Sequence, residues 1–236
     1  MKKIIFTIIA LTVCVVSASS QTMTVKLKNG QKVTYQTSEV EDVEFEEAYN
    51  PEGATYHNGH EYVDLGLPSG KLWATCNVGA SKPEEIGNYF SWGETEPKDY
   101  YSEENSECYG KDMVNDISGT EYDVAHVKWG GKWRMPTMLE LSEMSGKCTW
   151  EKKKIEGTYY FIGTGPNGNN IIFPAAGWMN VFNPGGDKDG AYWSSEKDSS
   201  MNAKMLWMIS ATGIQPNMTN PIYFGQSVRP IFTPEE

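Results

Sequence analysis

The chain has 236 residues, of which 39% are apolar and eight are tryptophan, so its composition favours a folded protein with a hydrophobic core over a disordered chain. Its 31 acidic and 20 basic residues give a net charge of −11. This excess of acidic residues disfavours nucleic acid as a partner, because binding a polyphosphate requires basic residues that neutralise it.

Residues 1–20 have the layout of a secretory signal peptide. Lys2 and Lys3 precede an apolar run, and small residues then lead to a cleavage site after Ser20. Lipidation at Cys14 is the weaker alternative, because the bulky Val13 precedes the cysteine. Cleavage would leave 18 basic and 31 acidic residues, a net charge of −13. No other apolar run reaches the about 18 residues needed to span a bilayer, so we expect a secreted or cell-surface protein.

Residues 21–48 are predicted to form a small β-hairpin segment. Two alternating runs, 24–28 and 31–35, flank Asn29-Gly30, and Asn-Gly suits a tight hairpin turn because both residues tolerate positive φ. The acidic stretch 39–47 contains apolar residues that are compatible with another strand. Residues 49–55 are rich in turn-forming residues and read as a linker.

Residues 56–233 are predicted to form an α+β domain of short antiparallel strands, one or two short helices and long loops. The expected strands are short apolar runs bounded by Gly, Pro and Asn, at 62–65, 71–74, 158–162, 171–173, 205–209 and 227–231. A helix is expected at 138–145 and a second helix or turn near 81–86. Two polar stretches, 94–122 and 183–202, are expected to be surface loops.

The start of the 138–145 helix carries a recognisable pattern. Thr137 and Glu140 have the spacing of a capping box, which makes Glu140 a cap rather than a catalytic acid, the alternative reading. Gly146 is expected to end the helix. The residues expected to be structural are Trp133, Arg134, Thr137, Glu140 and Arg229.

Six phrases in this domain occur in a fixed order and carry a family resemblance. They are EYVDLGLPSGKLWATCNVGA (61–80), GNYFSWGET (87–95), DVAHVKWGGKWRMPT (123–137), FPAAGW (173–178), AYWSSE (191–196) and GQSVRPI (225–231). Together they resemble the Fibrobacter succinogenes major paralogous domain, a family of exported bacterial proteins abundant in gut Bacteroidetes. The domain is also similar in motif to the C-terminal domain of the Legionella collagen-like adhesin.

The resemblance implies a C-type-lectin-like fold and a role in extracellular binding or adhesion, with glycans as one possible ligand. The family supplies no agreed catalytic residues, so none is assigned here. The hairpin segment resembles, more weakly, short modules that precede cell-surface domains in the same bacteria.

Three cysteines would remain in the mature chain: Cys76, Cys108 and Cys148. In an oxidising compartment one disulfide and one free thiol is the simplest arrangement, and spacing does not distinguish the three possible pairs. All three cysteines could equally remain reduced and buried. A metal site is the weaker interpretation, because no Cys-x-x-Cys occurs.

Candidate ligand-binding residues lie in or beside the expected loops. Trp178 and the pair Tyr100-Tyr101 could stack on the apolar face of a sugar, with core packing the alternative for Trp178. Glu94, beside Trp92, is the best single candidate for a functional acid, and the alternative is that it accepts hydrogen bonds from loop amides.

Calcium is the natural cofactor to consider for a lectin-like fold. Asn183, Asp187 and Asp189 place oxygen donors in a Gly-rich turn that could suit a hard cation. The distal glutamate of an EF-hand loop is missing, so Ca²⁺ is a possible cofactor rather than an established one.

The sequence therefore favours a secreted or cell-surface module that binds an extracellular glycan or protein. One alternative is an extracytoplasmic hydrolase or oxidase on the same fold. Another is a structural component of a surface assembly, in which the N-terminal hairpin docks by strand addition.

Overall fold

The computed structural model describes residues 2–7, 22–26, 32–37, 40–46, 55–155, 157–185, 188–209 and 213–234. The chain divides into two compact units, Met1–His60 and Glu61–Glu236. Within the described residues, no helix is both long enough and apolar enough to cross a bilayer.

The first unit contains paired strands. Antiparallel β2 and β3 place Thr24 opposite Thr34, and their hydroxyls are hydrogen-bonded at 3.1 Å. The turn predicted at Asn29-Gly30 between them lies outside the described residues. β1 pairs in parallel with β4. Because β1 falls within the predicted signal peptide, cleavage after Ser20 would remove it. The strands of this unit are β1 (Lys2–Thr7), β2 (Thr22–Lys26), β3 (Lys32–Gln36), β4 (Val40–Glu46) and β5 (Tyr56–His57).

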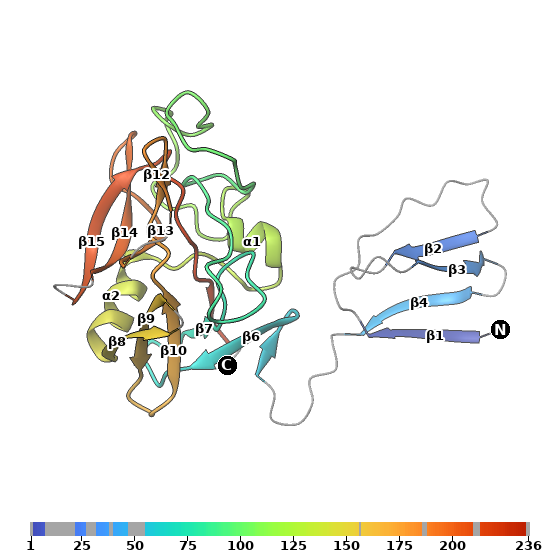
Figure 1. Ribbon diagram of the computed structural model, residues 1–236. Helices are drawn as coiled ribbons and strands as arrows, with labels where there is room; N and C mark the ends of the chain where they lie inside the picture. Colours follow the sequence, from blue (N-terminus) through green and yellow to red (C-terminus); the bar gives the residue numbers. More distant parts are fainter. Residues whose placement is uncertain are drawn as a thin grey trace. The chain divides into compact units, whose positions relative to one another are not determined.

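The second unit is α+β, with mostly antiparallel strands and two short helices (Figure 1). Its sheets have the strand orders β10–β9–β8, β13–β14–β15 and β16–β7–β6, and β11 pairs with β12. The helices are α1 (Val124–Trp129) and α2 (Met138–Lys147). The strands are β6 (His60–Asp64), β7 (Leu72–Ala74), β8 (Thr149–Ile155), β9 (Thr158–Thr164), β10 (Asn170–Pro174), β11 (Met179–Asn180), β12 (Asn183–Pro184), β13 (Gly190–Lys197), β14 (Asn202–Ile209), β15 (Gly213–Pro221) and β16 (Ile231–Phe232).

Residues 81–84 form turns, which is one of the two readings that the sequence left open for this segment. The Glu85 carboxylate accepts hydrogen bonds from the backbone N–H and the hydroxyl of Ser81. Another expectation about secondary structure was wrong. The stretch 183–202 contains β13, a strand buried over most of its length, and is not simply a surface loop.

The start of α2 contains the predicted capping box and an ion pair. The Thr137 hydroxyl accepts from the Glu140 N–H, and the Glu140 carboxylate accepts from the Thr137 N–H at 2.9 Å. Arg134 donates two hydrogen bonds to the same carboxylate, at 2.8 and 2.5 Å. Glu140 therefore holds the helix start onto the preceding chain. Gly146 lies inside the helix, which continues to Lys147.

The short helix α1 was not anticipated, and it begins at a buried carboxylate. Asp123 accepts hydrogen bonds from four backbone N–H groups, those of Gly119, Ala125, His126 and Met135, at 2.8–3.1 Å. Burial raises the pKa of Asp123, although these hydrogen bonds act in the opposite direction. One side chain thus caps α1 and holds it to the chain that leads into α2.

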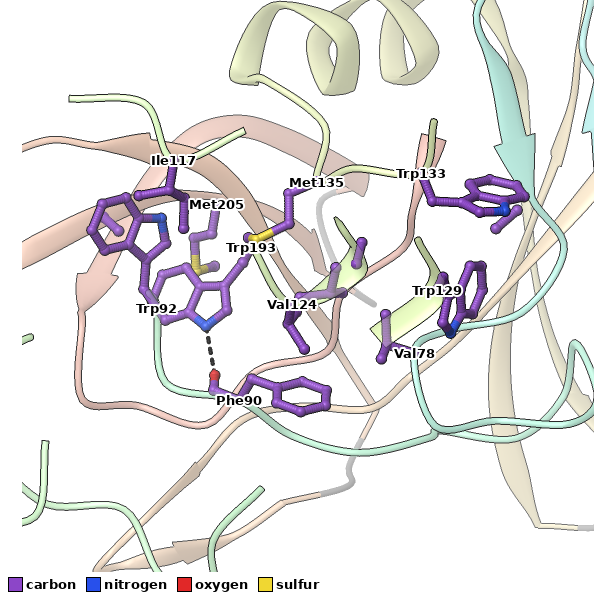
Figure 2. Packing of buried hydrophobic residues seen from close by; sticks show 14 of the residues in the cluster. Val78, Phe90, Trp92, Ile117, Val124, Trp129, Trp133, Met135, Trp193 and Met205 are labelled. Atoms are coloured by element: carbon purple, nitrogen blue, oxygen red, sulfur yellow. Dashed lines mark hydrogen bonds between the residues drawn. The ribbon is translucent and has the colours of Figure 1, made fainter. Parts of the chain in front are cut away.

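A tryptophan-rich hydrophobic cluster forms the first core of this unit (Figure 2). Trp193 is 1% exposed, and its indole N–H donates to the Phe90 carbonyl at 2.8 Å. Trp92 is fully buried and donates to the Ser194 carbonyl at 3.0 Å. The rings of Trp129 and Trp133 pack edge to face at 5.2 Å. Each indole therefore contributes a large buried area, and for Trp92 and Trp193 the polar nitrogen is satisfied.

A second cluster packs around α2, and β7 contributes to both. Leu72 and Ala74 point into the first cluster and Trp73 into the second, as expected for alternate residues of a strand covered on both faces. Leu141 and Met144 of α2 fill the second cluster.

Arg229 lies fully buried between these two regions. Its guanidinium donates to Asn77 Oδ1 and to the carbonyls of Ala74, Thr75 and Ile172, and it lies 4.3 Å from the Phe173 ring centroid. Burial lowers its pKa to about 10. The arginine is structural, because its donors are used within the protein.

Candidate functional site: an aromatic loop surface

The long loop that follows residue 94 is held in place by a buried glutamate. Glu94 accepts hydrogen bonds from the Ser106 hydroxyl at 3.1 Å and the Glu107 N–H at 2.8 Å. Its other oxygen pairs with Lys98. This is the arrangement of the alternative interpretation, in which the acid satisfies groups of its own loop. Glu94 positions the loop and does not point a free carboxylate at a ligand.

The two adjacent tyrosines of this loop have different environments. Tyr100 is 60% exposed, whereas Tyr101 is 1% exposed. The Tyr101 hydroxyl donates to the Tyr89 carbonyl at 2.6 Å and accepts from the Lys98 N–H at 3.1 Å. The prediction that both tyrosines offer a binding platform is therefore wrong for Tyr101, which is a core residue, while Tyr100 remains available at the surface.

Trp178 lies between the core and the surface. It is half-buried and packs edge to face on Trp207, with ring centroids 6.0 Å apart. The hairpin β11–β12 follows directly, and its tip carries Val181 and Phe182, which are 62% and 94% exposed. Asn180 Oδ1 accepts from the N–H groups of Phe182 and Asn183, which fixes the tip. A nearly fully exposed phenylalanine is thus presented on an ordered turn.

Gly225 joins this hairpin to the tyrosine loop. Met179 and Gly225 exchange two backbone hydrogen bonds, at 2.7 and 2.9 Å. A Cβ atom on Gly225 would lie only 2.7 Å from the Tyr101 ring, so the glycine permits the ring to pack directly against the backbone. Figure 1 shows the loop around residue 105 and β12 at the same end of the unit. Segments around residues 101, 179 and 225 therefore form one region.

Further aromatic side chains at this region were not identified from the sequence. Tyr109, Tyr223 and Phe224 are half-buried, and Tyr223 packs edge to face on both of the others, at 5.2 and 5.0 Å. The pair Tyr223-Phe224 between Pro221 and Gly225 was the available signal, since adjacent aromatics in a turn rarely both reach the core. We define the loop surface as Tyr100, Tyr109, Trp178, Phe182, Tyr223 and Phe224.

The candidate calcium ligands are only partly within the described residues. Asn183 Oδ1 accepts from the Gly185 N–H at 3.1 Å, and the Asp189 carbonyl accepts from the Gly177 N–H at 2.8 Å. Asp187 lies outside the described residues. Over the ranges that the structure covers, no group of three or more His, Cys, Asp or Glu side chains is arranged to hold a metal ion. Calcium binding remains a prediction of the sequence.

Cys76, Cys108 and Cys148 are free thiols, the arrangement that the sequence left open beside a single disulfide. They lie in different surroundings: Cys108 Sγ donates to the Gly93 carbonyl, whereas Cys148 packs in the second cluster. Burial raises the pKa of Cys108 and of Cys148 to about 11, so both thiols are protonated at neutral pH. A protonated thiol is a poor nucleophile, which argues against oxidase chemistry at these two cysteines.

Comparisons of the chain with family models, curated proteins and solved structures found no match.

Proposed function

We propose that this protein is a secreted or cell-surface binding module that recognises an extracellular glycan or protein through the loop surface. The observation that carries the proposal is the grouping of aromatic side chains from three separate segments at one end of the second unit. Aromatic side chains supply large contact areas at low conformational cost, to sugar faces and to proteins alike.

The packing beneath the surface supports this proposal. Glu94 fixes the tyrosine loop, Asn180 fixes the hairpin tip, and Gly225 joins the two. A loop whose backbone is already ordered loses less entropy when a partner binds, so a preorganised surface binds more tightly. The C-type-lectin-like fold implied by the family resemblance is part of the same proposal, since binding loops at one end of the domain are what that fold would present.

The test is an array of glycans and extracellular proteins, probed with the wild-type chain and two variants. Phe182→Ala is expected to weaken binding to any glycan or protein on the array about tenfold, because the few residues that dominate an interface are often aromatic. Leu139→Ala is the matched control, because Leu139 on α2 is 79% exposed yet lies outside the loop surface. A parallel array with a chelator tests the calcium prediction.

Absence of binding to every glycan and protein would argue against the proposed function. Equal loss of binding in Leu139→Ala and Phe182→Ala would instead place the binding elsewhere on the protein.

A further inference from the structure

Two half-buried tyrosines of the loop surface lie beside two exposed glutamates. Tyr109 and Tyr223 pack edge to face at 5.2 Å, and the Tyr109 hydroxyl donates to Glu103 Oε1 at 3.3 Å. Partial desolvation and the charge of Glu103 raise the pKa of Tyr109. Partial desolvation together with the charges of Glu103 and Glu104 raises the pKa of Tyr223. The Glu103 carboxylate therefore contacts the Tyr109 phenol, and Glu104 is the next residue in the chain.

The backbone under these side chains is tied down. The Ser91 hydroxyl donates to the Tyr223 carbonyl at 3.3 Å, and the Tyr109 N–H donates to the Ser106 hydroxyl at 3.2 Å. Ser106 in turn donates to the buried Glu94. The backbone at Tyr109 and Tyr223 is thus held in place before any partner arrives.

Neither carboxylate is neutralised by a lysine or arginine of the described part of the chain. The nearby Lys98 pairs with Glu94 and donates to the Asn105 carbonyl instead. Glu103 and Glu104 form no ion pair among the residues that the structure places. Among the described residues, no cation therefore compensates the negative charges of Glu103 and Glu104.

We propose that Tyr109, Tyr223, Glu103 and Glu104, here called the tyrosine–glutamate site, bind an arginine or lysine side chain of a partner protein. The inference rests on the proposed function, because it assigns a partner chemistry to part of the loop surface. A cation is attracted both by the aromatic π-systems and by the carboxylates. Arginine fits best, since its planar guanidinium can stack on a tyrosine while it donates to a carboxylate.

The net negative charge of the chain also favours the binding of a cationic partner. The net charge of −11 raises the local concentration of cations near the surface and speeds their encounter with the protein. An organic cation also suits the site better than a metal ion, because a guanidinium can stack on the tyrosine rings, whereas a hard metal ion is held by oxygen ligands alone.

The experiment is an NMR titration of the full chain with the acetylated and amidated peptide Gly-Arg-Gly-Arg-Gly. Its neutral counterpart carries citrulline in place of arginine, which keeps the shape and removes the charge. The amide signals of Tyr109 and Tyr223 are expected to shift with the arginine peptide and not with the citrulline peptide. Binding should weaken as salt is raised, because exposed charges are screened.

Three variants locate the site. Glu103→Gln combined with Glu104→Gln is expected to weaken binding about fivefold, the size expected for exposed ion pairs. Tyr223→Leu is expected to weaken it about threefold through loss of the cation–π contact. Glu107→Gln is the control and should bind like the wild type, because it removes one negative charge from the same loop and Glu107 is not among the charges that raise the pKa of either tyrosine.

Equal binding of the citrulline peptide, undiminished binding by the double glutamine variant, or no binding of the arginine peptide would each overturn the inference. The proposed function would still stand if the array shows a partner whose binding depends on Phe182. Failure of the array, in contrast, removes the proposed function itself, so the two failures are distinguishable.

Discussion

The start of α2 and the loop surface hold their side chains by different means. At the helix start, Arg134, Thr137 and Glu140 lie within one short segment and satisfy one another through local hydrogen bonds. In the loop surface, Tyr100, Trp178 and Tyr223 come from separate segments that meet around Gly225. The first arrangement contributes to stability, whereas the second depends on stability and is expected to contribute binding.

Replacing Glu140 should have the largest effect on stability. Glu140→Ala leaves the Arg134 guanidinium without its carboxylate and removes half of the capping box, so we expect a loss of about 3 kcal/mol in the free energy of unfolding. Urea denaturation measures this loss. The neighbouring Leu139→Ala, at an exposed position of the same helix, should change stability by less than about 0.5 kcal/mol. Similar losses in the two variants would contradict the role assigned to Glu140.

Replacing Gly225 tests whether the packing of Tyr101 against the backbone supports the loop surface. In Gly225→Ala the new methyl group would collide with the buried Tyr101 ring, so we expect a loss of about 2 kcal/mol and weaker binding on the array. Gly146→Ala is the control, because a Cβ there meets no atom within 4 Å inside a helix. It should raise stability by about 0.5 to 1 kcal/mol. A neutral Gly225→Ala would show that Tyr101 can move without cost.

The third and smallest effect is a pH dependence specific to the helix start. Burial raises the pKa of Glu140, but hydrogen bonds from Arg134 and Thr137 outweigh it, and the net pKa lies below the ordinary 4.5. The stability that this carboxylate contributes is therefore present above about pH 4.5 and is lost as the pH falls through its folded-state pKa.

Unfolding measured from about pH 6 down to about pH 3 should accordingly show a shallower loss of stability in Glu140→Gln than in the wild type. Asp123 acts in the opposite sense, because its raised pKa makes the folded state bind protons more readily than the unfolded state. An identical slope in the Glu140→Gln variant and the wild type would show that the ion pair contributes nothing to acid stability.

The sequence predicted local features well and the assembly of distant segments poorly. The capping box was visible because Thr137 and Glu140 are three residues apart and bond to each other. Nothing near Tyr101 in the sequence indicates that it is buried while Tyr100 is exposed, because the decisive neighbour is the missing side chain at Gly225. Tyr223 was missed as a surface residue for the same reason: its aromatic neighbours include Tyr109, which is far away in the chain.

Arg229 has a consequence for how the second unit opens. Its guanidinium donates hydrogen bonds to a backbone carbonyl of β7 and to one of β10, and it lies over the ring of Phe173. Separating either strand from Arg229 would leave this buried cation with an acceptor missing, so opening one strand while the other stays in place costs free energy. Native-state hydrogen exchange should therefore find the amide protons of β7 and β10 exchanging together, with one common opening free energy.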